Sequence, residues 1–213
     1  MGTGSPLNGR YKMAVTLTTP NTLLGVFQPK GDAARLAANL VTVVVGTLLI
    51  TLAAKISVPV WPVPITLQSF AIAGLAAAFG WRIGVSTVAL YLLEGAAGLP
   101  VFAGATAGIP YLMGPTGGFL FGFLPFAAII GAAADRGASS KPISLFVAML
   151  VAEVVLLAIG FTWLALMSGQ TGFGPIVTFA FNGAVKPFLI WDLLKMALAA
   201  LTVTGLYGLT RKS

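Results

Sequence analysis

The chain has 213 residues, of which 58% are hydrophobic and only 8% are charged, and its formal net charge is +7. So few charges exclude an ordinary soluble domain of this size and indicate that the lipid bilayer is the solvent. The sequence contains no cysteine and no histidine, which excludes disulfides, thiolate metal sites and the usual general base. We therefore predict neither an enzyme nor a metal or cofactor site.

The polar N-terminal segment, residues 1–32, lacks the apolar core of a signal peptide. Met13 offers a second start, so residues 1–12 are either native or an extension. We assign residues 33–213 to a six-helix membrane domain.

Six apolar stretches predict an all-α integral membrane protein with six transmembrane helices. They run from Leu36 to Ile56, Ile65 to Phe79, Ile83 to Leu99, Gly118 to Ala134, Pro142 to Met167, and Pro187 to Leu209. A spanning helix needs about 20 residues. The second stretch is shorter, so it begins within residues 61–64 or sits inside a bundle.

Lys and Arg accumulate on the cytoplasmic side of membrane proteins, so their positions predict the orientation. With both termini in the cytoplasm, the external side holds only Lys55 and Lys186, and the basic residues reflect topology rather than nucleic-acid binding. The external connections, residues 57–64, 96–115 and 168–187, are rich in proline, glycine or aromatic residues, and a solute site should open to this side. Nine basic residues are then cytoplasmic: Arg10, Lys12, Lys30, Arg35, Arg82, Arg136, Lys141, Arg211 and Lys212.

An acid and a base, Asp192 and Lys195, lie three residues apart in the last apolar stretch. Ionisable side chains in a spanning helix cost about 2.5–3.5 kcal/mol each on insertion scales and are functional by default. Positions i and i+3 share a helix face, so both side chains should face the same cavity. They either recognise a polar solute through an acceptor and a donor or form a structural ion pair, and we favour recognition.

Other polar and aromatic residues lie at a similar predicted depth. Thr66 and Gln68 are near the outer end of the second stretch, where a buried amide needs either a ligand or another helix as its partner. Asn182 is a further candidate for solute contact. The aromatic candidates either contact the solute or belong to the interfacial belt of aromatic residues: Tyr91, Tyr111, Trp61 and Trp191.

The segment Gly114-Pro-Thr-Gly-Gly118 opens the fourth stretch. Thr116 is expected to cap the helix and to leave backbone N–H groups available to an anion, the alternative being a plain turn with close helix packing. No Gly-x4-Gly-Lys-Ser/Thr pattern occurs in the sequence, so this chain has no P-loop site for ATP.

Two more acids lie in the apolar stretches. Glu94, near the outer end of the third, either reaches the interface or pairs with Lys55 or Lys186. Glu153, in the middle of the fifth, pairs with a partner subunit, relays protons or is neutral, and the sequence leaves these alternatives open.

Several segments form an ordered set between Leu48 and Ala199. They are Pro62-Val-Pro-Ile-Thr-Leu-Gln68, Tyr91-Leu-Leu, Gly98-Leu-Pro-Val-Phe-Ala-Gly104, Gly114-Pro-Thr-Gly-Gly-Phe-Leu-Phe-Gly-Phe123, Gly160 with Trp163-Leu, and Pro187 through Asp192-Leu-Leu-Lys195. Together they resemble the biotin-specific S component of energy-coupling-factor (ECF) transporters, the BioY family.

This resemblance implies a high-affinity, vitamin-binding, multi-pass subunit of a bacterial cell membrane. Asp192 and Lys195 are expected at the head of biotin, whose ureido ring offers two N–H donors and one carbonyl, with apolar walls around the thiophane ring and valerate chain. The expected partners are a transmembrane coupling (T) subunit and ABC-type ATPase subunits that supply ATP hydrolysis. Whether the chain also forms a homo-oligomer is left open.

The sequence departs from the family in two respects. Glu94 stands where an apolar residue is usual, and the external loops offer no arginine to the biotin carboxylate, which meets either backbone N–H groups of residues 104–118 or water. The alternative function is a solitary proton-coupled secondary transporter of a small solute, which would use Asp192, Lys195, Glu94 or Glu153.

Overall fold

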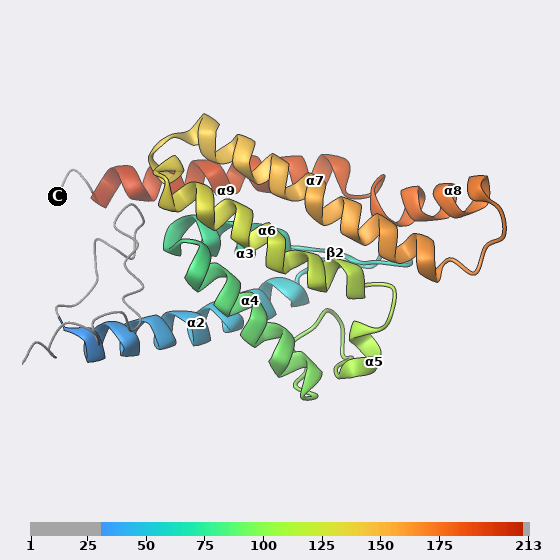
Figure 1. The fold of residues 1–213 in the computed structure, drawn as a ribbon, viewed down its shortest axis with the longest axis horizontal. Helices are drawn as coiled ribbons and strands as arrows, with labels where there is room; N and C mark the ends of the chain where they lie inside the picture. Colours follow the sequence, from blue (N-terminus) through green and yellow to red (C-terminus); the bar gives the residue numbers. More distant parts are fainter. Residues whose placement is uncertain (1–30, 211–213) are drawn as a thin grey trace, which may run out of the picture.

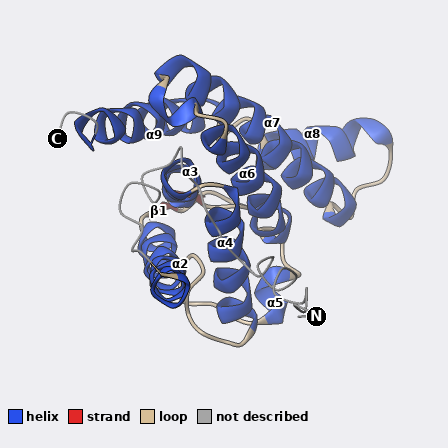
Figure 2. Ribbon diagram, turned by 60° about the vertical axis from the view of Figure 1, so that its left-hand side comes forward, coloured by secondary structure: helices blue, strands red, loops and turns tan. Residues whose placement is uncertain are grey.

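The computed structural model describes residues 31–210, and helices make up most of this part of the chain (Figures 1 and 2). This confirms the all-α prediction, since β1 and β2 have only two residues each. The predicted tail falls almost wholly outside the described residues. In chain order the elements are α2 (Asp32–Lys55), β1 (Ser57–Val58), β2 (Ile65–Thr66), α3 (Gln68–Phe79), α4 (Trp81–Ala96), α5 (Ile109–Leu112), α6 (Gly117–Asp135), η1 (Ala138–Ser140), α7 (Pro142–Met167), α8 (Phe173–Ala184) and α9 (Leu189–Thr210).

Four segments of the described chain are long and apolar enough to cross a membrane: Asp32–Lys55, Gly117–Asp135, Pro142–Met167 and Phe173–Thr210, which joins α8 and α9. The prediction of six spans also needs α3 and α4, which have 12 and 16 residues. At 1.5 Å per residue they cover about 18 and 24 Å, less than the roughly 30 Å of a hydrocarbon core. The short second stretch is thus observed, and the number of spans stays a prediction.

The two ends of the helical assembly differ. The start of α2, the α6–α7 connection with η1 and the end of α9 lie at one end, and α5 and α8 lie at the other (Figure 1). β1 and β2 pair antiparallel. The connection between them reaches α8, where the Trp61 ring packs edge-on against Phe179 with centroids 5.9 Å apart.

Helix α6 lies at the centre and packs against α3, α4 and α7. Small residues permit the close approach of α6 and α7, as is common between membrane helices. A Cβ atom at Gly122 would lie 2.8 Å from the Leu156 side chain, and one at Gly160 would lie 2.5 Å from the Phe119 ring. This packing brings aromatic rings of α6 and side chains of α7 to one interior space.

The prediction for residues 168–187 was incomplete, because the structure places α8 within this connection. Gly172 and Pro175 are loop signals, but here they mark a helix start. Gly172 has φ of +88° just before the helix, and Pro175 lies in the first turn, where the backbone N–H groups have no intrahelical partner.

The capping prediction for Thr116 was wrong. This residue precedes α6 with φ −77° and ψ −16°, and its side chain makes no capping hydrogen bond. A side-chain N-cap normally needs an extended backbone at that position, which Thr116 does not have.

Candidate functional site

A narrow cavity lies between α3, α6, α7 and α9. Its volume is about 30 Å³, and it is partly open to the surface. Its polar side chains gather on α3, α9 and β2, and its apolar walls come largely from α6. The lining residues are Val63, Pro64, Thr66, Gln68, Ser69, Thr116, Phe119, Leu120, Phe123, Leu156, Phe188, Asp192 and Lys195.

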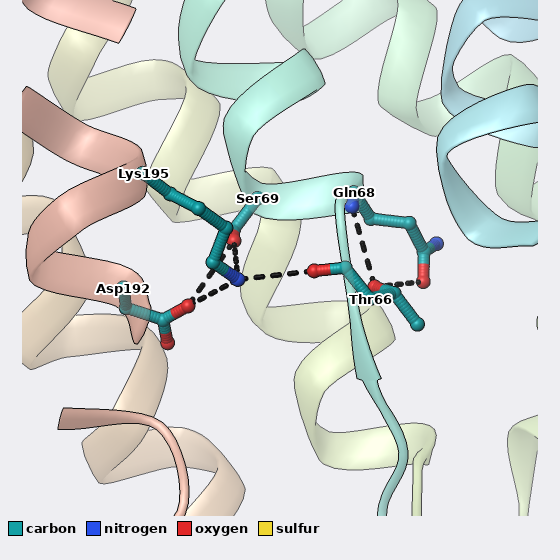
Figure 3. A network of polar contacts seen from close by, with 5 residues as sticks. All are labelled: Thr66, Gln68, Ser69, Asp192 and Lys195. Atoms are coloured by element: carbon teal, nitrogen blue, oxygen red, sulfur yellow. Dashed lines mark hydrogen bonds and ion pairs between the residues drawn. The ribbon is translucent and has the colours of Figure 1, made fainter. Parts of the chain in front are cut away.

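Lys195 is the centre of a polar network on one side of this cavity (Figure 3). Its ammonium pairs with Asp192 and donates to the Ser69 hydroxyl at 2.8 Å and to the Thr66 carbonyl at 3.0 Å. The Ser69 hydroxyl also lies 3.5 Å from Asp192 Oδ1. An ammonium has three hydrogens, so each has an acceptor in this arrangement.

Local helix geometry brings Asp192 and Lys195 together, as the spacing predicted. Both lie on α9, whose first turn contains Asp192, where a carboxylate also interacts favourably with the helix dipole. Asp192 is 3% exposed, and the Lys195 side chain is 11% exposed. With so little water, the pair is barely screened, and a carboxylate and an ammonium face the same small space.

Gln68 and Thr66 form a second polar group beside the first (Figure 3). The Thr66 hydroxyl donates to Gln68 Oε1 at 3.0 Å, and Gln68 Nε2 donates to the Tyr91 hydroxyl at 2.9 Å. Tyr91 in turn donates to the Val101 carbonyl at 3.0 Å. Tyr91 is fully buried and absent from the cavity lining, so it orients Gln68 from behind.

The structure does not bring the other candidates to this cavity, including Trp61, which is 80% exposed. Tyr111 stacks on the Phe102 ring with centroids 5.1 Å apart, and burial raises the pKa of its hydroxyl. Asn182 is exposed on α8, and Trp191 is 57% exposed on the outer face of α9. Ligand contact by these residues stays a prediction.

Glu94 lies apart from the cavity on α4 and accepts a hydrogen bond from Thr47 at 3.1 Å. Of the alternatives for Glu94, the pair with Lys55 is not observed, because that ammonium donates to the carbonyls of Phe102 and Gly104 at 2.7 and 2.8 Å. Lys55 therefore ties the end of α2 to the connection that follows α4.

Sequence reasoning missed Ser69 and the aromatic walls. Ser69 follows Gln68 in the first turn of a helix, and two adjacent polar residues in an apolar stretch are the signal that could have found it. Phe119 and Phe188, with ring centroids 5.2 Å apart, gave no signal of their own, because phenylalanine is common throughout this chain.

Residues 22–212 match the family model described as the BioY family. The chain belongs to this family. It is 38% identical to the biotin transporter BioY of Thermotoga maritima, with 73% of this chain and 87% of that protein covered. It is 35% identical to the probable biotin transporter BioY of Pyrococcus horikoshii, with 76% and 91% covered.

A solved structure has the same fold. The crystal structure of the S component for biotin from an ECF-type ABC transporter aligns with a TM-score of 0.73 at 23% sequence identity, over 84% of this chain and 95% of that one. This BioY-family chain is accordingly a membrane protein of the S-component fold, and the family predicted from the ordered segments is confirmed.

Proposed function

We propose that this chain is the biotin-binding S component of an ECF-type vitamin importer and that the cavity beside Asp192 holds biotin. The observation that carries the proposal is the buried pair of Asp192 and Lys195 on the polar side of a cavity whose other walls are aromatic and aliphatic, in a chain whose relatives are named biotin transporters.

The polar network complements a ureido ring. Asp192 accepts from a ureido N–H, and Lys195 or Ser69 donates to the ureido carbonyl. All three Lys195 hydrogens already have protein acceptors. A ureido carbonyl that binds Lys195 therefore takes the place of one of these acceptors.

The apolar lining suits the rest of the molecule. Phe119, Phe123 and Phe188 offer aromatic faces to the thiophane ring and the valerate chain. The cavity volume of about 30 Å³ is that of about one water molecule in the liquid. Biotin is much larger than this space, so binding requires wall side chains or the segment at Val63 and Pro64 to move outward.

The arrangement of charges supports a multi-pass topology with both termini in the cytoplasm of a bacterial cell. Arg136 and Lys141 flank the α6–α7 connection, which lies at the same end as the start of α2 and the end of α9 (Figure 1). This end is then cytoplasmic by the positive-inside rule, and α3 and α4 complete six spans.

ATP hydrolysis is assigned to separate ABC-type ATPase subunits, joined through a transmembrane coupling subunit, because this sequence has no P-loop. The names of the relatives do not favour the alternative of a solitary proton-coupled transporter of another solute.

Titration of biotin into the purified chain in detergent tests the proposal. Lipoic acid is the matched control, since it has the same valerate chain and a sulfur ring but no ureido group. Near-stoichiometric binding of biotin at submicromolar concentration, with lipoic acid far weaker, is expected. Equal affinity for biotin and lipoic acid, or no binding of biotin by a folded sample, would contradict the proposal that the cavity recognises the ureido ring.

A further inference from the structure

Glu153 is a buried acid that the proposed function does not use. It lies in the middle of α7 and is 5% exposed. Neither carboxyl oxygen has a hydrogen-bond partner among the described residues. A buried polar group without a partner is rare and costs about 1–3 kcal/mol, more for a charge. The surroundings of Glu153 must therefore reduce the free-energy cost of burying its carboxyl group.

Glu153 shares a helix face with a residue that lines the binding cavity. Leu156, one helical turn along α7, lines that cavity, and α7 packs against α9. Asp192 and Lys195 of α9 lie close enough to Glu153 to interact with it electrostatically. The three ionisable side chains thus form one buried cluster built from two helices.

Among the described residues, the neighbouring helices bring no further charge to balance this cluster. The sequences of α3 and α8 contain no Asp, Glu, Lys or Arg, and α6 has only Asp135, at its far end. Asp192 and Lys195 already cancel each other. An ionised Glu153 would leave one net negative charge in a region of low dielectric, next to a second carboxylate, at a cost of several kcal/mol.

We propose that Glu153 carries a proton and donates it in a hydrogen bond to Asp192, which fixes the Asp192 carboxylate toward the cavity. A proton on one group explains why two carboxyl groups lie together. Two ionised carboxylates can only accept hydrogen bonds, so they repel each other, whereas a protonated carboxyl group can donate to an ionised one. Glu153 is then a positioning residue for ligand recognition. The role of Glu153 in ligand binding rests on the proposed function. The presence of a proton on Glu153 does not.

Infrared spectroscopy of the purified chain without ligand tests the proton directly. A protonated carboxyl group has a C=O stretching band that an ionised carboxylate lacks. The difference spectrum between the native chain and E153Q is expected to contain this band, with a shift in D2O. The E94Q variant is the matched control, because Glu94 lies away from the cavity and should leave the Glu153 band in place.

Biotin titration of two variants tests the positioning. E153Q keeps a neutral donor of the same shape and should bind biotin nearly as the native chain does. E153L removes the donor and should weaken binding about tenfold or more, as expected for the loss of a hydrogen bond to a charged group. Thermal unfolding without ligand would show whether either variant is folded.

Three results would overturn the proposal. Ionised-carboxylate bands in place of the acid band would show that Glu153 holds no proton. Equal weakening in E153Q and E153L would show that the negative charge is what matters, and native affinity in E153L would remove the positioning role. Failure of the native chain to bind biotin, with the acid band present, would count against the proposed function and leave the proton site standing.

Discussion

The change of Asp192 to Asn tests how the cavity recognises its ligand. Asparagine has nearly the same shape as aspartate, so the helix packing of α9 is kept. The variant has an amide oxygen that still accepts from Lys195, but the negative charge is lost. Any large effect on binding therefore comes from the charge and from the pattern of donors and acceptors.

The size of the effect follows from burial. Because Asp192 is 3% exposed, water does not replace the lost contact. A charge-assisted hydrogen bond to a ureido N–H contributes about 1.5–3 kcal/mol, so biotin affinity should fall about tenfold to a hundredfold. The Lys195 ammonium also loses its anionic partner, which should lower the free energy of unfolding by about 1–3 kcal/mol.

Isothermal titration and thermal unfolding of the same detergent preparation measure both quantities. The D32N variant is the control, because Asp32 is 89% exposed at the start of α2 and lies 3.8 Å from Arg35. It should bind and unfold as the native chain does. Native biotin affinity in a folded D192N sample would refute the assignment of Asp192 to the ureido ring.

Three further changes separate the residues around the cavity. The S69A variant should lower the midpoint of thermal unfolding without ligand, since Lys195 loses one acceptor worth about 1.5–3 kcal/mol. In Y91F the buried Gln68 amide loses its acceptor at 2.9 Å, so unfolding should again shift down and biotin affinity should fall less than in D192N. The N182A and W191A variants should keep native affinity, because both side chains are exposed outside the cavity lining; a marked loss in either would restore its predicted ligand contact.

Hydropathy and local geometry predicted much of this fold. The fifth apolar stretch has the same bounds as α7, from Pro142 to Met167, because both ends are marked by polar or turn-forming residues. The prediction failed for α8, where glycine and proline lie at a helix start rather than in a loop. Such residues carry the same signal in both situations, and only tertiary packing distinguishes them.

In the candidate site, too, local sequence rules predicted some contacts and tertiary packing decided the others. The i, i+3 spacing of Asp192 and Lys195 was enough to predict that the two side chains meet, since one helix fixes both positions. Trp191 precedes Asp192 and is rotated by about 100° from it around the helix, so helical geometry alone argues for another face. Ser69 lies more than a hundred residues from Lys195 in sequence. No local rule connects them, and only the packing of α3 against α9 brings them into contact.

The structure of this chain with biotin bound would test the central claim most directly. The ureido nitrogen is expected within hydrogen-bond distance of the Asp192 carboxylate, with the ureido oxygen next to Lys195 or Ser69 and the thiophane ring among the phenylalanines of α6. A bicyclic head placed elsewhere, or turned so that Asp192 faces the valerate chain, would contradict the account.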